Sequence, residues 1–303
     1  SLSFYLEKTL IKMLSDLQIA TLEGEGYLII DNLFSADDLW PVKEEFNLLV
    51  EYQAQALYQA GRLSDLYQDL PFERRLAEIA AQVPEVVSAL FSEGRFHKGE
   101  SLFQFMKHPK ILDRVEPLVG SEILCHPSYN IHPRLPGGYT SPHQDAGYYL
   151  PDGDQTLIVA CLIPLVDTTV DNGCLWVAPG RHREGVFRHV WAEDGLNLLV
   201  EDIPMSERIP VPTPAGSLVM FGSMLPHGSL VNKTETIRWS MDLRYQAIGA
   251  ATGRWYVPGF VARSRSNPAL ETATSQSWAK AVSEVKQQAD KFPEWPRNRW
   301  PRT

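Results

Sequence analysis

Two short apolar stretches, residues 156–163 (Thr-Leu-Ile-Val-Ala-Cys-Leu-Ile) and residues 217–221 (Ser-Leu-Val-Met-Phe), decide the fold class. Both are rich in apolar and β-branched residues and lie between Pro, Gly or Asp, which is typical of buried β-strands. Residues 237–248 form a longer strand candidate, and the pattern of short strands and turns begins near Gly120. Many short strands in succession predict a β-sandwich or barrel rather than βαβ units.

The chain before Gly120 has a different, mostly helical pattern. Residues 25–30 predict an opening strand, and Ser35 with Asp38 forms a capping box that starts a helix. Residues 71–91 and 109–118 are two further helix candidates. Apolar residues recur at helical spacing after the capping box at Leu39, Val42, Phe46, Leu49 and Val50.

These patterns fit one catalytic domain over residues 1–303. We expect a helical flank with an opening strand at 1–119, a β core at 120–250 and a C-terminal extension at 251–303, in which residues 267–291 form a loop and then a helix. Residues 186–209 interrupt the strand pattern and carry many charges. We interpret them as an insertion that covers the opening of the site.

Composition excludes several classes of protein. The chain has 28 Lys and Arg against 37 Asp and Glu, a net charge of −9, and no cluster of basic residues of the kind that binds nucleic acid. The C-terminal Arg297, Arg299 and Arg302 are expected in a solvated tail. No apolar run approaches the roughly 20 residues of a membrane span. The partner we expect is a small-molecule substrate, and the oligomeric state stays open.

Cysteine usage favours a reducing compartment. The three residues Cys125, Cys161 and Cys174 are odd in number, contain no CxxC pair and lie in apolar runs, so we expect buried thiols rather than disulfides or a zinc site. Residues 1–14 are a poor signal peptide, which predicts a cytoplasmic protein. The chain begins with Ser1 rather than Met, which leaves room for a trimmed targeting segment.

The pair His143 and Asp145 is the first candidate for chemistry. In a strand the two side chains point to the same face, and together with His227 they offer two imidazoles and one carboxylate. That donor set leaves open positions on a metal and is the facial triad of non-haem Fe(II) oxygenases. A His-x-Asp pair arises by chance about 0.4 times in a chain of this composition. A surface His beside an Asp is therefore the alternative for that pair taken alone.

Arg238 follows His227 by eleven residues, and Ser240 lies two positions further along the same strand candidate. A guanidinium beside a hydroxyl on one face suits the distal carboxylate of a keto acid such as 2-oxoglutarate. The alternative for Arg238 is a structural ion pair.

Three stretches resemble the phytanoyl-CoA dioxygenase (PhyH-like) family of 2-oxoglutarate oxygenases. They are His143-Gln144-Asp145 after a Pro-Gly-Gly-Tyr-Thr turn, residues 171–182, and residues 227–238 from His227-Gly228-Ser229 to Arg238. The matches keep the family order over roughly residues 25–250. The resemblance implies a mainly β fold with flanking helices, built on a double-stranded β-helix, or cupin-like jelly-roll, core.

The resemblance also implies the cofactors and their residues. It implies Fe(II) on His143, Asp145 and His227, with 2-oxoglutarate and O2 as co-substrates and Arg238 on the distal carboxylate. Ser240 is expected to assist Arg238. Asn130 is favoured over its neighbour His132 for a contact to the co-substrate, with a structural strand residue as the alternative.

The expected reaction is hydroxylation of an unactivated C–H bond of a metabolite, with release of succinate and CO2. Relatives that halogenate have a small residue in place of Asp145, so its presence here predicts hydroxylation, desaturation or cyclisation instead of halogenation. The candidates for the substrate pocket are Tyr148, Trp176, Arg134 and His132. Two alternatives stay open: a cupin-like metal-binding protein or isomerase, which needs no cation for a keto acid, and a zinc hydrolase, which usually has a further acid or base.

The remaining histidines receive structural interpretations. His182 belongs to a structural turn, and His126 lies on a predicted strand near the site. We expect His97, His108 and His189 at the surface or at helix ends.

Overall fold

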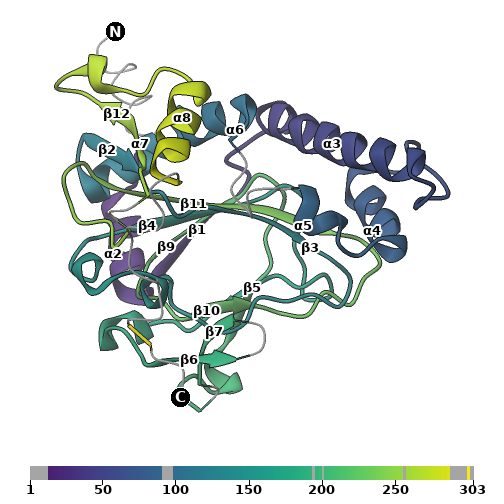
Figure 1. Ribbon diagram of the computed structural model, residues 1–303. Coiled ribbons are helices and arrows are strands. Elements are labelled where there is room, and N and C mark those ends of the chain that lie inside the picture. Colours follow the sequence, from purple (N-terminus) through teal and green to yellow (C-terminus); the bar gives the residue numbers. More distant parts are fainter. Residues whose placement is uncertain are drawn as a thin grey trace, which may run out of the picture.

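A large seven-stranded sheet forms the centre of the molecule, with helices on its outer face (Figure 1). A computed structural model describes residues 13–90, 98–192, 195–199, 201–254, 257–286 and 299–300. The large sheet has the strand order β1-β9-β4-β11-β2-β12, and β3 pairs with the first half of β11. Its strands are β1 Tyr27–Ile30, β2 Glu122–Cys125, β3 Asn130–Arg134, β4 Val159–Pro164, β9 Leu218–Gly222, β11 Arg238–Ala247 and β12 Phe260–Ser264.

A smaller antiparallel sheet faces the large one in the order β10-β5-β8. Its strands are β5 Leu175–Val177, β8 Ile209–Val211 and β10 His227–Ser229, and a separate hairpin is formed by β6 His189–Ala192 and β7 Gly195–Leu198. Apolar side chains of β4 and β9 pack against β5 and β8 between the sheets. This is the expected jelly-roll core with flanking helices, and its sheets do not close into a barrel.

Most helices cover the outer face of the large sheet, whereas α2 (Asp16–Glu25) packs against its edge strand β1 (Figure 1). The other described helices are α3 Ala36–Gln59, α4 Phe72–Gln82, α5 Val86–Leu90, α6 Glu100–Met106, α7 Pro109–Val119 and α8 Ser275–Lys286. Helix α3 starts at the predicted capping box, where the Ser35 hydroxyl accepts from the Asp38 amide and the Asp38 carboxylate accepts from the Ser35 amide. None of the helices in the described ranges is long and apolar enough to span a bilayer.

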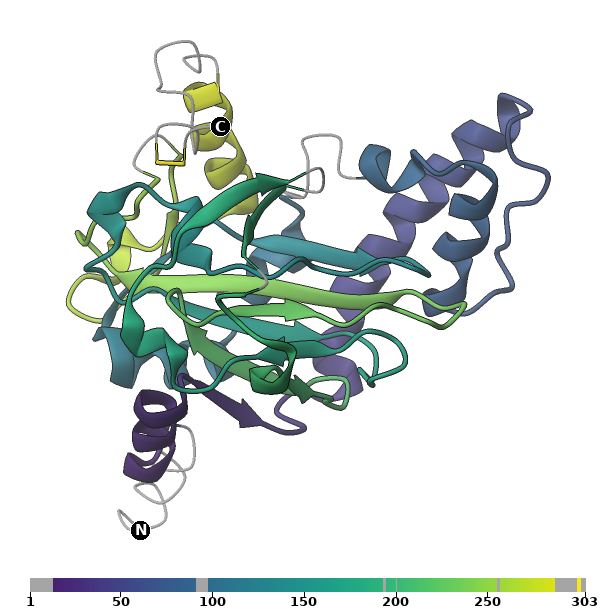
Figure 2. The ribbon, with the colours of Figure 1, turned by 90° about the horizontal axis from the view of Figure 1, so that it is seen from below.

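Strand β11 crosses the middle of the large sheet (Figure 2) and separates two environments. Side chains alternate between the faces of a strand. One face carries Trp239, Met241, Leu243 and Tyr245, which pack into the core beneath the helices. The other face carries Arg238, Ser240, Asp242 and Arg244, which are buried between the sheets. The polar face of β11 therefore lines the interior of the jelly roll.

Several predicted bounds need correction. The helix predicted over residues 71–91 is two helices, because the backbone of Val83 before Pro84 leaves the helical region at φ −132°. Phe91 itself lies outside the described residues. The opening strand starts only at Tyr27, since residues 16–25 form α2 and Gly26 ends it with φ 86°. The C-terminal extension also contributes a strand, because β12 pairs with β2.

Candidate metal centre

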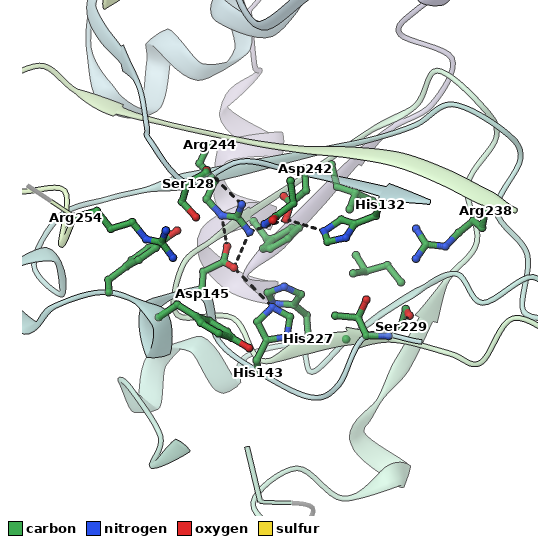
Figure 3. A pocket seen from close by; sticks show the side chains of 18 residues that line it. Ser128, His132, His143, Asp145, His227, Ser229, Arg238, Asp242, Arg244 and Arg254 are labelled. Atoms are coloured by element: carbon green, nitrogen blue, oxygen red, sulfur yellow. Dashed lines mark hydrogen bonds and ion pairs between the residues drawn. The ribbon is translucent and has the colours of Figure 1, made fainter. Parts of the chain in front are cut away.

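His143, Asp145 and His227 converge between the two sheets (Figure 3). Their candidate ligand atoms all lie within 4.8 Å of one another. His143 Nε2 is 3.8 Å from Asp145 Oδ1. Such spacing suits three donors that bind one ion through bonds of about 2 Å.

The local structure that brings these ligands together is not the predicted strand. His143 forms an isolated β-bridge with His227, in which each backbone amide donates to the other's carbonyl at 2.9 Å. Asp145 instead begins a 3-10 turn, η1 (Asp145–Tyr148). The expectation that strand alternation aligns His143 with Asp145 is therefore wrong. The bridge joins the two imidazoles, and the turn brings the carboxylate to them.

Both imidazoles are oriented by backbone carbonyls. His143 Nδ1 donates to Ser141 O at 2.8 Å, and His227 Nδ1 donates to Leu225 O at 2.9 Å. Because a carbonyl only accepts, the proton is on Nδ1 and Nε2 keeps its lone pair. Burial, together with the nearby His227, lowers the pKa of His143 to about 3, and burial also lowers the pKa of His227. Both rings are thus neutral at physiological pH, as metal ligands must be.

Arg244 holds the Asp145 carboxylate from the opposite side. Its Nε donates to Asp145 Oδ2 and its Nη2 donates to Asp145 Oδ1, both at 2.7 Å, and the arginine is 2% exposed. Burial alone would raise the pKa of Asp145, but the charge and hydrogen bonds of Arg244 outweigh it and hold the pKa well below its usual range. Asp145 is therefore ionised and fixed in orientation. No sequence motif singled out Arg244, although it lies on the same face as Arg238.

Asp242 is the second carboxylate on Arg244. Its Oδ2 accepts from Arg244 Nη2 at 2.6 Å and lies 3.9 Å from His132 Nε2. Burial raises the pKa of Asp242 to about 7; the charge of Arg244 opposes the rise, and the charge of Asp145 adds to it. One guanidinium is thus shared by two buried carboxylates. Sequence reasoning missed Asp242 as well.

Arg238 has a different environment at the other end of the site (Figure 3). It is 4% exposed, and its Nη1 donates to Ser240 Oγ at 2.8 Å, which shows the shared face expected for these two residues. Its Nε has no hydrogen-bond partner among the described residues, and no described carboxylate forms an ion pair with it. Burial lowers the pKa of Arg238 to about 10, so the side chain stays charged at neutral pH.

A cavity of about 440 Å³ joins these groups. Among the residues expected at the site, its walls include the triad together with Asn130, His132, Tyr148 and Arg238, and they also include Ser128, Asp242, Arg244 and Arg254. Figure 3 shows Arg238 at one end, the triad in the middle, and Arg254 with Ser128 at the other end. The volume lies in the range of small-molecule sites.

Two residues expected in the substrate pocket lie outside its walls. Trp176 packs behind Gly228, where a Cβ would meet the indole at 2.7 Å, and the guanidinium of Arg208 lies 4.7 Å from the centre of the indole. Alternation along β5 turns Leu175 into the cavity and Trp176 away from it. Arg134 lies opposite Arg238 at the end of β3, and its Nη2 is 3.1 Å from His132 Nδ1.

The 186–209 segment packs beside the loop that carries the ligands. The Leu198 amide donates to Pro142 O, and the Tyr148 hydroxyl donates to Leu196 O, both at 2.7 Å. His189 within it is 2% exposed, and its Nε2 accepts from the Gln144 amide at 3.1 Å. The expectation of a surface position for His189 is therefore wrong. Its imidazole supports the residue between the two ligands His143 and Asp145.

The C-terminal Arg299 is also not a solvated residue. It forms hydrogen bonds of 2.8 and 2.7 Å with Asp154, and it donates to the carbonyls of Ala146 and Tyr149. Trp300 Nε1 donates to Gly147 O at 2.7 Å. These contacts brace the turn that begins at Asp145. Arg297 and Arg302 lie outside the described residues.

The other expectations concern structural residues. His108 caps the N-terminus of α7, and His182 donates to the carbonyl of Glu23, as suits a turn. His126 is buried, and its Nε2 donates to Thr252 O at 2.8 Å. His97 lies outside the described residues. The three cysteines are buried free thiols, namely Cys125, Cys161 and Cys174.

Comparison with known proteins shows which proteins this chain resembles. Residues 22–240 match the family model described as "Phytanoyl-CoA dioxygenase (PhyH)". Peroxisomal phytanoyl-CoA dioxygenase of Mus musculus is 29% identical over 236 residues, and the Homo sapiens protein is 26% identical over 233 residues. Each match covers 74% of this chain and 65% of the relative, so it spans slightly less than two thirds of the relatives' length.

A similar fold is found among solved structures. The non-heme monooxygenase ThoJ, in its apo form, has a TM-score of 0.58 at 20% identity, over 91% of this chain and 100% of ThoJ. At that identity the likeness supports the jelly-roll fold alone. The family model covers well over half of the chain, and the chain belongs to the phytanoyl-CoA dioxygenase (PhyH) family.

Proposed function

We propose that this protein is an Fe(II)- and 2-oxoglutarate-dependent oxygenase that hydroxylates a C–H bond of a small-molecule metabolite. The observation that carries the proposal is the buried Arg238, which has no carboxylate partner among the described residues and shares one cavity with the His143, Asp145 and His227 triad. A metal-binding jelly roll without keto-acid chemistry has no need for this cation.

The donor set fits iron. Two neutral imidazoles and one ionised carboxylate on one side of an ion leave positions opposite them for other ligands. The Nδ1 contacts to Ser141 and Leu225 hold the two Nε2 atoms toward that ion. His143, Asp145 and His227 would therefore hold Fe(II) without rearrangement of their hydrogen bonds.

The keto acid fits the same cavity. Arg238 would bind its distal carboxylate through charged hydrogen bonds, and Ser240, which does not line the cavity, would assist by holding the guanidinium through its hydroxyl. Asn130 lines the cavity on β3, opposite Asp242 in the strand register, and would offer its amide to the co-substrate. When bound, iron and 2-oxoglutarate together supply the oxidation: O2 is consumed, the keto acid is converted to succinate and CO2, and a substrate C–H bond is hydroxylated.

The remaining work of the protein is orientation and exclusion of water. Tyr148 borders the cavity, and its hydroxyl is tied to Leu196, so the aromatic ring is held as a wall beside His143. His132 lies on the β3 side, near Asp242. A fixed wall keeps the substrate in one orientation relative to the metal and keeps water from reactive species.

An anaerobic titration tests the proposal. Fe(II) and 2-oxoglutarate should together produce the visible charge-transfer band of a chelated keto acid. His227→Ala should lose this band, while Asp113→Asn, a substitution at an ion pair of α7 outside the cavity, should keep it. Absence of the band in the wild-type protein would refute the co-substrate assignment. Incorporation of isotopically labelled O2 into a product then separates hydroxylation from epimerisation or cyclisation.

A further inference from the structure

Asp242 lies in the cavity wall and carries a buried carboxylate oxygen that is unsatisfied among the described residues. The residue lines the cavity and is 4% exposed. Its Oδ2 accepts from Arg244, but its Oδ1 has no hydrogen-bond partner among the described residues. A buried carboxylate oxygen is stable only when something donates to it, so the partner of Oδ1 is expected to come from a ligand.

The co-substrate cannot be that partner. At neutral pH 2-oxoglutarate carries two carboxylates and a ketone, all of which accept hydrogen bonds, and it would meet the Asp242 carboxylate with like charge. Arg238, at the other end of the polar face of β11, supplies the cation that this ligand needs. The donor to Oδ1 must therefore belong to a different molecule in the same cavity.

The hydrogen bonds of Asp242 leave one oxygen for a ligand. Arg244 Nη2 donates to Oδ2 at 2.6 Å, so Oδ1 is the oxygen that can accept from a further donor.

We infer that the primary substrate donates a hydrogen bond from an O–H or N–H group to Asp242 Oδ1. The inference rests on the proposed function and narrows its substrate class. The substrate is a hydroxylated or amine-bearing metabolite whose donor lies close to the C–H bond that is oxidised. A saturated acyl chain at this position would bury Oδ1 without a partner, whereas the apolar wall residues Leu162, Leu175 and Phe221 can pack against the carbon skeleton of such a metabolite.

Matched small molecules test the inference directly. Mn(II) replaces Fe(II) on the full chain with saturating 2-oxoglutarate, and nuclear relaxation of the probe protons reports binding near the metal. Cyclohexanol and cyclohexylamine carry a donor, whereas methoxycyclohexane keeps the ring and the oxygen but has none. We expect the two donors to bind at least about tenfold more tightly than the ether, a ratio equivalent to about 1.4 kcal/mol.

Asp242→Asn should reverse this preference. Arg244 requires an acceptor, so the amide oxygen takes the place of Oδ2 and the NH₂ group takes the place of Oδ1. The side chain at position 242 would then donate a hydrogen bond to the ligand instead of accepting one. Methoxycyclohexane should therefore bind more tightly than it does to the wild-type protein, and cyclohexylamine more weakly. Asp113→Asn is the matched control: it exchanges the same groups at an ion pair with Arg263, outside the cavity, and should keep the wild-type order.

The outcomes separate the two proposals. Equal binding of cyclohexanol and its methyl ether to the wild-type protein overturns the inference, as does an unchanged order of probes in Asp242→Asn. Loss of Mn(II) or 2-oxoglutarate binding in Asp242→Asn also overturns it, because Asp242 would then act through Arg244 on the metal ligand. Failure of the proposed function appears earlier, as absence of 2-oxoglutarate binding by the wild-type protein without any probe.

Discussion

Arg238 and Arg244 are two buried arginines on the same face of one strand, yet their surroundings are opposite. Arg244 makes three hydrogen bonds of 2.6 to 2.7 Å to the carboxylates of Asp145 and Asp242. Arg238 has one hydrogen bond to the Ser240 hydroxyl and no carboxylate partner among the described residues. Both side chains are at most 4% exposed.

Arg244 is a cation that holds two carboxylates of the protein in place, whereas Arg238 is a cation whose carboxylate partner would come from a ligand. A buried charge is costly unless it is paired. Around Arg244 the protein supplies two carboxylates for one guanidinium, so the charge of the arginine is balanced by Asp145 even when Asp242 is protonated. Around Arg238 the described residues supply no carboxylate, which is tolerable if an anionic ligand completes the site. Substitution of the two arginines should therefore affect different properties.

The largest effect is expected from Arg244→Met. The change removes the countercharge between two buried carboxylates, and loss of one partner from a buried ion pair typically costs about 3–5 kcal/mol of unfolding free energy. Metal affinity should also fall, on the order of 10- to 100-fold, because the orientation of Asp145 is lost. Urea unfolding and metal titration measure the two effects.

A second arginine serves as control for that prediction. Arg114 on α7 is half-buried, and its Nη1 donates to Lys110 O. Arg114→Met should leave metal affinity unchanged and reduce stability by less than about 1 kcal/mol. If Arg244→Met is no more destabilising than Arg114→Met, the role given to Arg244 is wrong.

The alternation of side chains along β11 predicted part of the site correctly. The Arg238–Ser240 pair follows from alternation along a strand, and their hydrogen bond shows that they share a face. The same alternation, extended by four residues, places Asp242 and Arg244 on that face as well. These two residues were missed because no motif marks them, although the signal was present in the strand itself.

Other parts of the site could not be predicted from local sequence patterns. The turn that starts at Asp145 depends on contacts from His189 and Arg299, which are distant in the chain. Propensity carries no information on such long-range contacts, and so both residues were assigned to the surface. The break between α4 and α5 at Pro84, by contrast, could have been predicted from the sequence, because the residue before a proline disfavours the helical region.

Arg238→Met tests the comparison of the two arginines at the one that has no carboxylate partner among the described residues. The free energy of unfolding should stay the same or rise, because the substitution removes a buried charge that has no carboxylate partner among the described residues. Affinity for 2-oxoglutarate should fall on the order of 100-fold, or about 3 kcal/mol, since the distal carboxylate loses its cation. Metal binding without the keto acid should be unchanged. A loss of stability as large as that of Arg244→Met would remove the distinction between the two arginines.

The smallest expected effect concerns the pH dependence of the metal-free protein. Burial raises the pKa of Asp242 from 3.8 to about 7, so between these values the folded protein holds a proton that the unfolded chain has released. Stability then falls as pH rises through this window. Asp145 behaves oppositely: its pKa is lowered, so its contribution is present at neutral pH and is lost only in strong acid.

Comparison of Asp242→Asn with the wild-type protein isolates this contribution. The buried histidines of the site, such as His143, have lowered pKa values and make stability rise with pH below about 6.5, but they are common to both proteins and cancel in the difference. Between pH 5 and pH 8 the wild-type protein should lose about 1–3 kcal/mol relative to Asp242→Asn in urea unfolding. Equal changes in both proteins would mean that Arg244 keeps Asp242 ionised throughout, so that its one positive charge suffices for both carboxylates. Asp242 would then be an ionised acceptor at neutral pH even in the metal-free protein.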